Sequence, residues 1–85
     1  MGIPKNKPVI ENTSAKLFGR NFRMLRSHRG LSIAHVSIAI NVSVYRLKKL
    51  EAGALKITAS LLIIVCDFFD VLIDCMVRQD LSIEQ

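Results

Sequence analysis

The sequence lacks the residue combinations that enzymes use. It holds two histidines and two cysteines among 85 residues, and it contains no Ser-His-Asp, Cys-His or paired-carboxylate arrangement and no glycine-rich phosphate loop. His28 and His35 are seven residues apart in the sequence, with no third ligand nearby, so a metal site is not expected. We therefore predict a protein that is not an enzyme and that needs no cofactor and no metal.

The cysteines and the apolar segments argue against a secreted, disulfide-bonded protein and against a membrane-spanning one. Cys66 and Cys75 stand in apolar context without metal-ligand spacing, which is typical of reduced core residues in a cytoplasmic protein. The apolar stretch 59–77 contains three aspartates. Each aspartate costs about 3 kcal/mol at the centre of a bilayer, so we expect no membrane span. The first residues lack the apolar segment of a signal peptide, and we expect no secretion signal.

Acidic residues are scarce in the first two thirds of the chain. Residues 1–56 hold eleven Lys and Arg against two acids, a net charge of +9, whereas residues 57–85 hold one Arg against five acids, a net charge of −4. This asymmetry predicts that the basic part meets a polyanion and that the apolar, acidic part meets protein. A merely solvated basic surface is the alternative that charge alone leaves open.

Segments that alternate with the period of a strand are missing too, so we predict an all-α fold. The apolar spacing predicts helices at about 14–28, 33–40, 44–52, 59–69 and 72–77, with Thr13 or Ser14 capping the first and Thr58 the fourth. Residues 1–12 are expected to form an extended arm, residues 13–77 the folded domain and residues 78–85 a polar tail. A core of this size is marginal alone, which favours oligomerisation.

The sequence predicts two short helices joined by a tight turn in the segment GLSIAHVSIAINVSVYRLKKLEAG. Ser32 and Ser43 stand where an N-cap belongs, because each hydroxyl can accept a hydrogen bond from a free backbone N–H. Gly30 and Gly53 follow apolar runs at positions where a positive φ costs glycine nothing. Asn41 suits a left-handed position in the turn. Such a pair with a basic second helix is typical of a helix-turn-helix that docks on duplex DNA.

The chain resembles the Cro/repressor-type, or lambda repressor-like, helix-turn-helix family, a compact five-helix domain. The resemblance covers about residues 18–77 and rests on FGRNFRMLRSHRGLS, VSIAINVSVYRLKKLEAG and DFFDVLIDCMV. It implies a homodimer on a palindromic operator in double-stranded DNA, with the second motif helix in the major groove. Glu51 stands where the family carries a Glu that buttresses the end of that helix. Ile33 and Val44 depart from the family, which usually places a phosphate-binding Gln and a polar base reader there.

The candidate DNA contacts lie mainly on the second motif helix. Arg46 and Lys49 are the main candidates, because Arg can bind guanine with two hydrogen bonds and Lys can donate to guanine or phosphate. Val44 could meet a thymine methyl and Tyr45 a base edge or the backbone, although both could instead pack against neighbouring side chains. Further contacts, mainly to phosphate, are predicted for Ser43, Lys48, Ile33, Arg20, Arg23, Arg26 and Lys56. A solvated surface cation is the alternative at each basic position.

A second surface is predicted at the apolar end of the chain. The fourth helix is expected to bury Leu62, Ile63, Val65, Cys66 and Phe69 and to leave Leu61 and Ile64 on an outer face. A dimer interface is therefore predicted from the apolar residues Leu61, Ile64, Leu72, Ile73, Met76 and Val77. The alternative is a thicker core packed against the N-terminal arm through Ile3, Val9 and Ile10.

Together these features predict a cytoplasmic, sequence-specific DNA-binding regulator of bacterial or phage type, most simply a repressor. A phage switch protein, a restriction–modification controller and an antitoxin all fit this description. Because 85 residues leave no room for a sensor domain, regulation would come from concentration, a protein partner or proteolysis. The competing hypothesis is a protein-interaction module on the same fold, which the apolar residues Ile33 and Val44 favour.

Overall fold

Five helices make up the part of the chain that the computed structural model describes, residues 13–81. They are α1 (Thr13–His28), α2 (Ile33–Ile40), α3 (Val44–Glu51), α4 (Ala59–Phe69) and α5 (Ile73–Arg78). No strand is present within this range, and the all-α prediction is confirmed. The predicted boundaries of α2 and α4 are correct, whereas α1, α3 and α5 differ from the prediction by one residue at one or both ends. The predicted N-terminal arm and the side chains of the proposed α1 caps lie outside the described residues.

Three helices begin at a hydroxyl cap, as predicted. Ser32 Oγ accepts a hydrogen bond from the backbone N–H of His35 at 3.0 Å. Ser43 Oγ accepts one from the backbone N–H of Arg46 at 3.1 Å, and Thr58 Oγ1 accepts one from the backbone N–H three residues later at 3.2 Å. Each cap satisfies a donor that the first helical turn leaves without a partner. The sequence therefore sets the starts of α2, α3 and α4 locally.

Four residues outside the helices adopt left-handed backbone conformations. Gly30 and Gly53 have φ of 69° and 74°, and Asn41 in the turn between α2 and α3 has φ of 58°, as the sequence predicts. Asp70 also has a positive φ of 57°, at the end of α4. Asp is one of the few residues besides Gly and Asn that enter this region at modest cost. These conformations lie at the ends of α1, α2, α3 and α4 and redirect the chain there.

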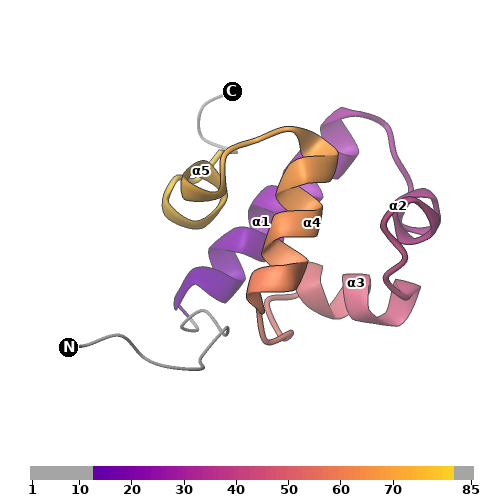
Figure 1. Cartoon of the computed structure of the whole chain (residues 1–85), viewed down its shortest axis with the longest axis horizontal. Coiled ribbons are helices and arrows are strands. Elements are labelled where there is room, and N and C mark those ends of the chain that lie inside the picture. The colour runs from indigo at the N-terminus through magenta and orange to yellow at the C-terminus, as the bar shows by residue number, and fades with distance from the viewer. Residues whose placement is uncertain (1–12, 82–85) are drawn as a thin grey trace.

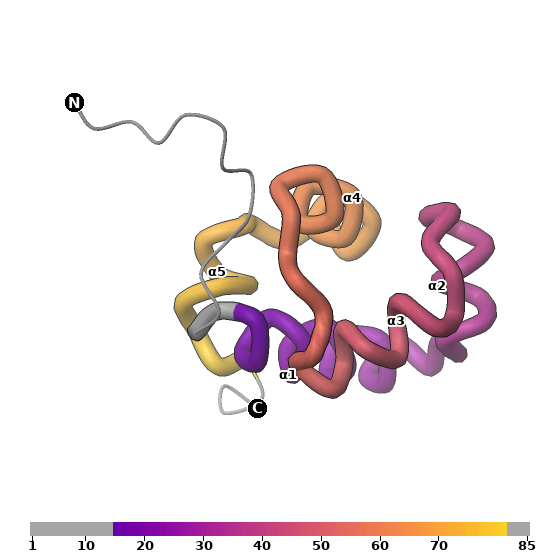
Figure 2. Tube along the Cα trace, turned by 90° about the horizontal axis from the view of Figure 1, so that it is seen from below, coloured from indigo at the N-terminus to yellow at the C-terminus, as the bar shows by residue number. Residues whose placement is uncertain are grey.

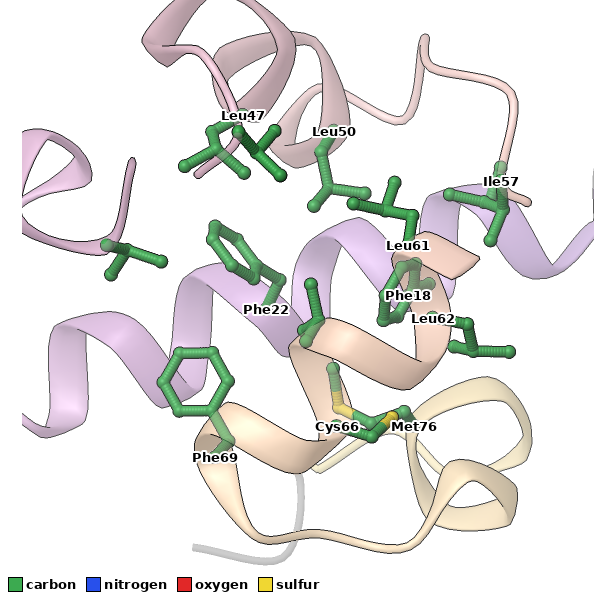
Figure 3. Packing of buried hydrophobic residues seen from close by; sticks show 14 residues of the cluster. Phe18, Phe22, Leu47, Leu50, Ile57, Leu61, Leu62, Cys66, Phe69 and Met76 are labelled. Atoms are coloured by element: carbon green, nitrogen blue, oxygen red, sulfur yellow. The ribbon is translucent and has the colours of Figure 1, made fainter. Parts of the chain in front are cut away.

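The core lies where α1 passes under α4, with α2 and α3 at one end of α1 and α5 toward the other (Figures 1 and 2). Phe18 and Phe22 of α1 are fully buried and face Leu47 and Leu50 of α3 as well as residues of α4 (Figure 3). The ring of Phe22 meets that of Phe69 edge to face, with centroids 5.7 Å apart. Since α1 contacts both α3 and α5, it connects the α2–α3 end of the domain to the α5 end.

Gly19 brings α1 and α3 into close contact. A Cβ atom at this position would lie 2.1 Å from the carbonyl oxygen of Leu50, a distance that real Cβ atoms essentially never show. Only a glycine therefore permits this approach of the two backbones. The position sets how deeply the end of α3 sits against α1, and the predictions from sequence did not include it.

Asn21 fastens the C-terminal part of the domain to α1. Its fully buried side-chain amide donates to the carbonyl oxygens of Met76 at 2.9 Å and Gln79 at 2.7 Å. Its side-chain oxygen accepts from the backbone N–H of Leu81 at 2.9 Å. One polar residue on the apolar face of α1 thus satisfies three backbone groups. The first residues of the predicted polar tail are consequently docked against the domain.

Candidate nucleic-acid interface

The helix α3 has one buried face and one solvent-facing face. Leu47 and Leu50 are fully buried, while Tyr45, Arg46 and Lys48 are exposed. The turn at Asn41 places α3 at the periphery next to α2, and its far end returns to α1 (Figure 1). The buried leucines fix the rotation of α3 about its axis, so the basic face must point outward.

The cations of α3 take part in no ion pair within the described residues. Among residues 13–81 the ion pairs involve Arg20, Arg26 and Arg78, none of which lies on α3. Lys49 has an internal partner of a different kind, because its Nζ lies 5.5 Å from the centroid of the Tyr45 ring. Surface cations that no carboxylate neutralises can be offered to phosphate oxygens, with the release of counterions from the nucleic acid.

The side chain of Arg26 forms hydrogen bonds within the domain, whereas a side chain that contacts the DNA backbone must reach solvent. Its Nε donates to Glu51 Oε2 at 2.5 Å and its Nη2 to Glu51 Oε1 at 3.2 Å, and the pair is largely buried. Its Nη1 donates to the carbonyl oxygen of Leu31 at 2.8 Å. Three of the five N–H donors of Arg26 are therefore bound inside the domain, which makes Arg26 a weaker candidate for the predicted contact with a DNA backbone. Arg26 instead joins the end of α3 to the segment that precedes α2.

The other basic candidates are Arg20, Arg23 and Lys56, and Arg29 is a further basic residue, just after α1. Arg20 Nη1 donates to Asp80 at 2.6 Å, and Arg29 donates to the carbonyl oxygen of Phe69 at 2.8 Å while lying over that ring. Arg23 and Lys56 are exposed and take part in none of the ion pairs found in residues 13–81. Arg23 and Lys56 are thus better placed than Arg20 to contact a polyanion.

The leading end of α3 carries the remaining candidates. Ser43 is exposed and uses its hydroxyl as the cap. Val44 and Tyr45 are exposed and are not members of the core cluster, so neither packs into the core of the domain. Ile33 at the start of α2 is half-buried and packs against the core. The surface therefore combines cations with two apolar side chains at the end of α3 nearest the turn.

The apolar surface of α4 and α5 differs from the predicted one. Leu61 is only 3% exposed and Met76 is fully buried (Figure 3), because both side chains complete the single core of the domain. Their predicted position on an outer face is wrong. Ile63 was expected inside, but it is 56% exposed. The apolar residues that do reach the surface of these helices and their junction are Ile63, Ile64, Leu72 and Ile73, while Val77 is half-buried against the core.

The other groups that could take part in chemistry are histidines, cysteines and carboxylates. Within the described range, no three His, Cys, Asp or Glu side chains are grouped as metal ligands would be. Both cysteines are free thiols, and burial raises the pKa of the Cys66 thiol. None of the described helices is long and apolar enough to cross a membrane.

Sequence reasoning missed two residues that position α3 and the C-terminal segment. Gly19 interrupts a strong helical run, and Asn21 stands between two phenylalanines on an apolar face. Each is a local inconsistency in the helical pattern, which is the signal that could have identified them.

Comparison with known proteins agrees with this geometry. A family model described as a helix-turn-helix domain matches residues 17–78. The crystal structure of the DNA-binding domain of BldD superimposes with a TM-score of 0.67 at 23% sequence identity, covering 80% of this chain and 99% of that one. At this identity the likeness shows a shared fold. No curated protein matches the chain. Because the family model spans most of the sequence, the chain belongs to the helix-turn-helix domain family.

Proposed function

We propose that this protein is a sequence-specific DNA-binding transcriptional regulator. Helix-turn-helix domains of this kind form a non-enzymatic regulator fold. The observation that carries the proposal is the outward face of α3, where Arg46 and Lys48 are exposed and outside the ion pairs of residues 13–81. A rigid helix with unneutralised cations matches the major groove in width and charge.

The buttress of α3 supports the same proposal. The bidentate pair between Arg26 and Glu51 and the close approach at Gly19 hold the C-terminal end of α3 against α1. The N-terminal end of α3 and its outer face remain exposed to solvent. A reading helix needs such support, because base contacts require side chains held within a fraction of an ångström.

The binding test begins with selection of bound sites from a random duplex library at near-physiological salt. We expect an enriched sequence. The double variant Arg46→Ala, Lys49→Ala should remain folded and lose specific binding. Arg46→Ala alone should weaken binding by about 5- to 150-fold, because a base-reading Arg contributes about 1–3 kcal/mol. Arg78→Ala on α5 is the matched control, because it removes the same charge and should have little effect. Unchanged affinity in the double variant would remove both residues as readers.

We further propose a homodimer that binds a palindromic operator, most simply as a repressor that excludes polymerase. One short helix contributes too little contact area for tight specific binding, so two linked copies would supply the affinity. The exposed apolar surface of α4 and α5, formed by Ile63, Ile64, Leu72 and Ile73, supports self-association. Of the residues predicted from sequence, Ile64, Leu72 and Ile73 stay in the proposed interface, with Val77 at its edge.

The dimer is tested separately from DNA binding. Sedimentation equilibrium should give a dimer for the natural chain and a monomer for Ile63→Lys. Ile63→Leu is the matched control, since it keeps an apolar side chain at the same position, which is 56% exposed. A natural chain that stays monomeric at high concentration contradicts the dimer but leaves DNA binding untouched.

A second function is favoured by one observation. Ile38 is a large apolar side chain exposed on α2, the first helix of the motif, and such a residue suits contact with a protein. Under this alternative the domain is a protein-interaction module with weak or non-specific DNA binding. Enrichment of no sequence, together with steep salt dependence of duplex binding, would favour it.

A further inference from the structure

We propose that the leading end of α3 selects thymine, through contact of Val44 and the Tyr45 ring with the C5 methyl group of that base. The inference rests on the proposed function, because it requires that α3 enter the major groove. It adds the chemical class of base that the site reads and the two side chains that read it.

The first step is the position of the two residues. Val44 and Tyr45 are the first two residues of α3, directly after the Ser43 cap. Val44 is 37% exposed and Tyr45 is 70% exposed. Neither contributes to the core cluster, so the exposed part of each side chain is open to a partner. They are consecutive residues at the end of α3 that is not held against α1.

The second step is the contact that orients the Tyr45 ring. The Nζ of Lys49, one helical turn later, lies 5.5 Å from the ring centroid. This cation–π contact favours a ring that lies along the surface of α3. The ring is therefore arranged beside an ammonium group that can donate to a base or a phosphate. An apolar patch and a cation are presented together.

The third step is the chemistry of the major groove. Its floor shows hydrogen-bond donors and acceptors at every base pair, and the thymine methyl is its one apolar group. A valine side chain or a ring face set against a donor or acceptor would displace water without replacing its hydrogen bond. Set against a methyl group, the same side chain buries apolar surface at no such cost. The pair at the start of α3 therefore discriminates in favour of thymine.

The test uses deoxyuridine, which keeps every hydrogen-bonding group of thymidine and removes only the methyl. Each thymine in the enriched duplex is replaced in turn, and the affinity is measured. Burying one methyl corresponds to about fourfold in affinity. We expect a loss of about fourfold at one thymine of a half-site. When the equivalent thymines of two half-sites are replaced together, the loss should be about fifteenfold.

Variants assign the effect to these side chains. Val44→Ala and Tyr45→Ala should each reduce the deoxyuridine penalty, whereas Tyr45→Phe keeps the ring and should retain it. A penalty below twofold at every thymine, with specific binding intact, overturns the thymine inference alone. A penalty that persists unchanged in both alanine variants also overturns it, because another side chain then reads the methyl. Enrichment of no sequence at all refutes the proposed function itself, and the inference fails with it.

Discussion

Replacing Gly19 by alanine should destabilise the domain, although alanine is the better helix former. In a helix interior, glycine is about 1 kcal/mol less favourable than alanine, so local propensity predicts that Gly19→Ala stabilises α1. The structure predicts the opposite sign. The new Cβ would lie 2.1 Å from the carbonyl oxygen of Leu50, and real Cβ atoms essentially never come within 3.0 Å. The backbones of α1 and α3 would have to move apart by about 1 Å.

The size of the effect follows from those two contributions. Overpacking costs about 1–3 kcal/mol, and a clash between two backbones belongs at the upper end because no side chain can rotate away. After the propensity gain is subtracted, a net loss of about 1–2 kcal/mol remains. For a domain of this size each kcal/mol lowers Tm by about 4–8 °C. Urea denaturation followed by circular dichroism measures the free energy, and an unchanged m-value would show that the unfolded state is not the cause.

Gly30→Ala is the matched control. Gly30 has φ of 69°, and a Cβ atom added there would have no atom within 4 Å. Its substitution therefore tests the left-handed backbone alone, at a cost of about 1–2 kcal/mol. The two variants differ in a second readout. Gly19→Ala displaces the end of α3 and should weaken DNA binding even at temperatures where the protein is folded, whereas Gly30→Ala should not. A Gly19→Ala protein as stable as the natural chain would refute the close approach of α1 and α3.

Three further predictions concern a turn, an ion pair and the thiols. Asp70→Gly should raise stability by about 0.5–1 kcal/mol in urea denaturation, because φ is 57° there and glycine adopts it without strain, and a loss of stability would show that the Asp70 side chain is needed. Glu51→Gln should lower the free energy of unfolding by about 1–3 kcal/mol in the same assay, since it leaves the largely buried Arg26 guanidinium without its counter-charge. An unchanged free energy of unfolding would show that the pair is dispensable. In the folded protein, Cys75 should react with iodoacetamide before Cys66, because burial raises the pKa of the Cys66 thiol and lowers its thiolate fraction. Mass spectrometry measures both rates, and equal rates would contradict this prediction. Because burial disfavours the Cys66 thiolate in the folded state and so raises the pKa of that thiol, the stability of the fold should fall as pH rises past the ordinary pKa of a thiol.

The sequence alone determined the features that depend on nearest neighbours along the chain. Hydroxyl caps at Ser32 and Ser43, and left-handed residues such as Asn41, satisfy or redirect the backbone within a few positions, so their roles follow from residue type and spacing. The apolar periodicity likewise placed Leu47 and Leu50 on the inner face of α3 and left its cations outside. The helix-turn-helix could therefore be predicted from the sequence alone.

Only the tertiary structure decided which side chains remain available to a partner. Arg26 and Arg23 look alike in the sequence, yet one is held by Glu51 and the other is exposed. Leu61 and Ile63 are both apolar residues of α4, yet the first is buried and the second is not. The physical reason is that a carboxylate 25 residues along the chain, or the angle at which α4 crosses α1, acts through contacts between segments distant in sequence. Local pattern carries no information about such contacts, and the availability of a surface is a property of the packed molecule.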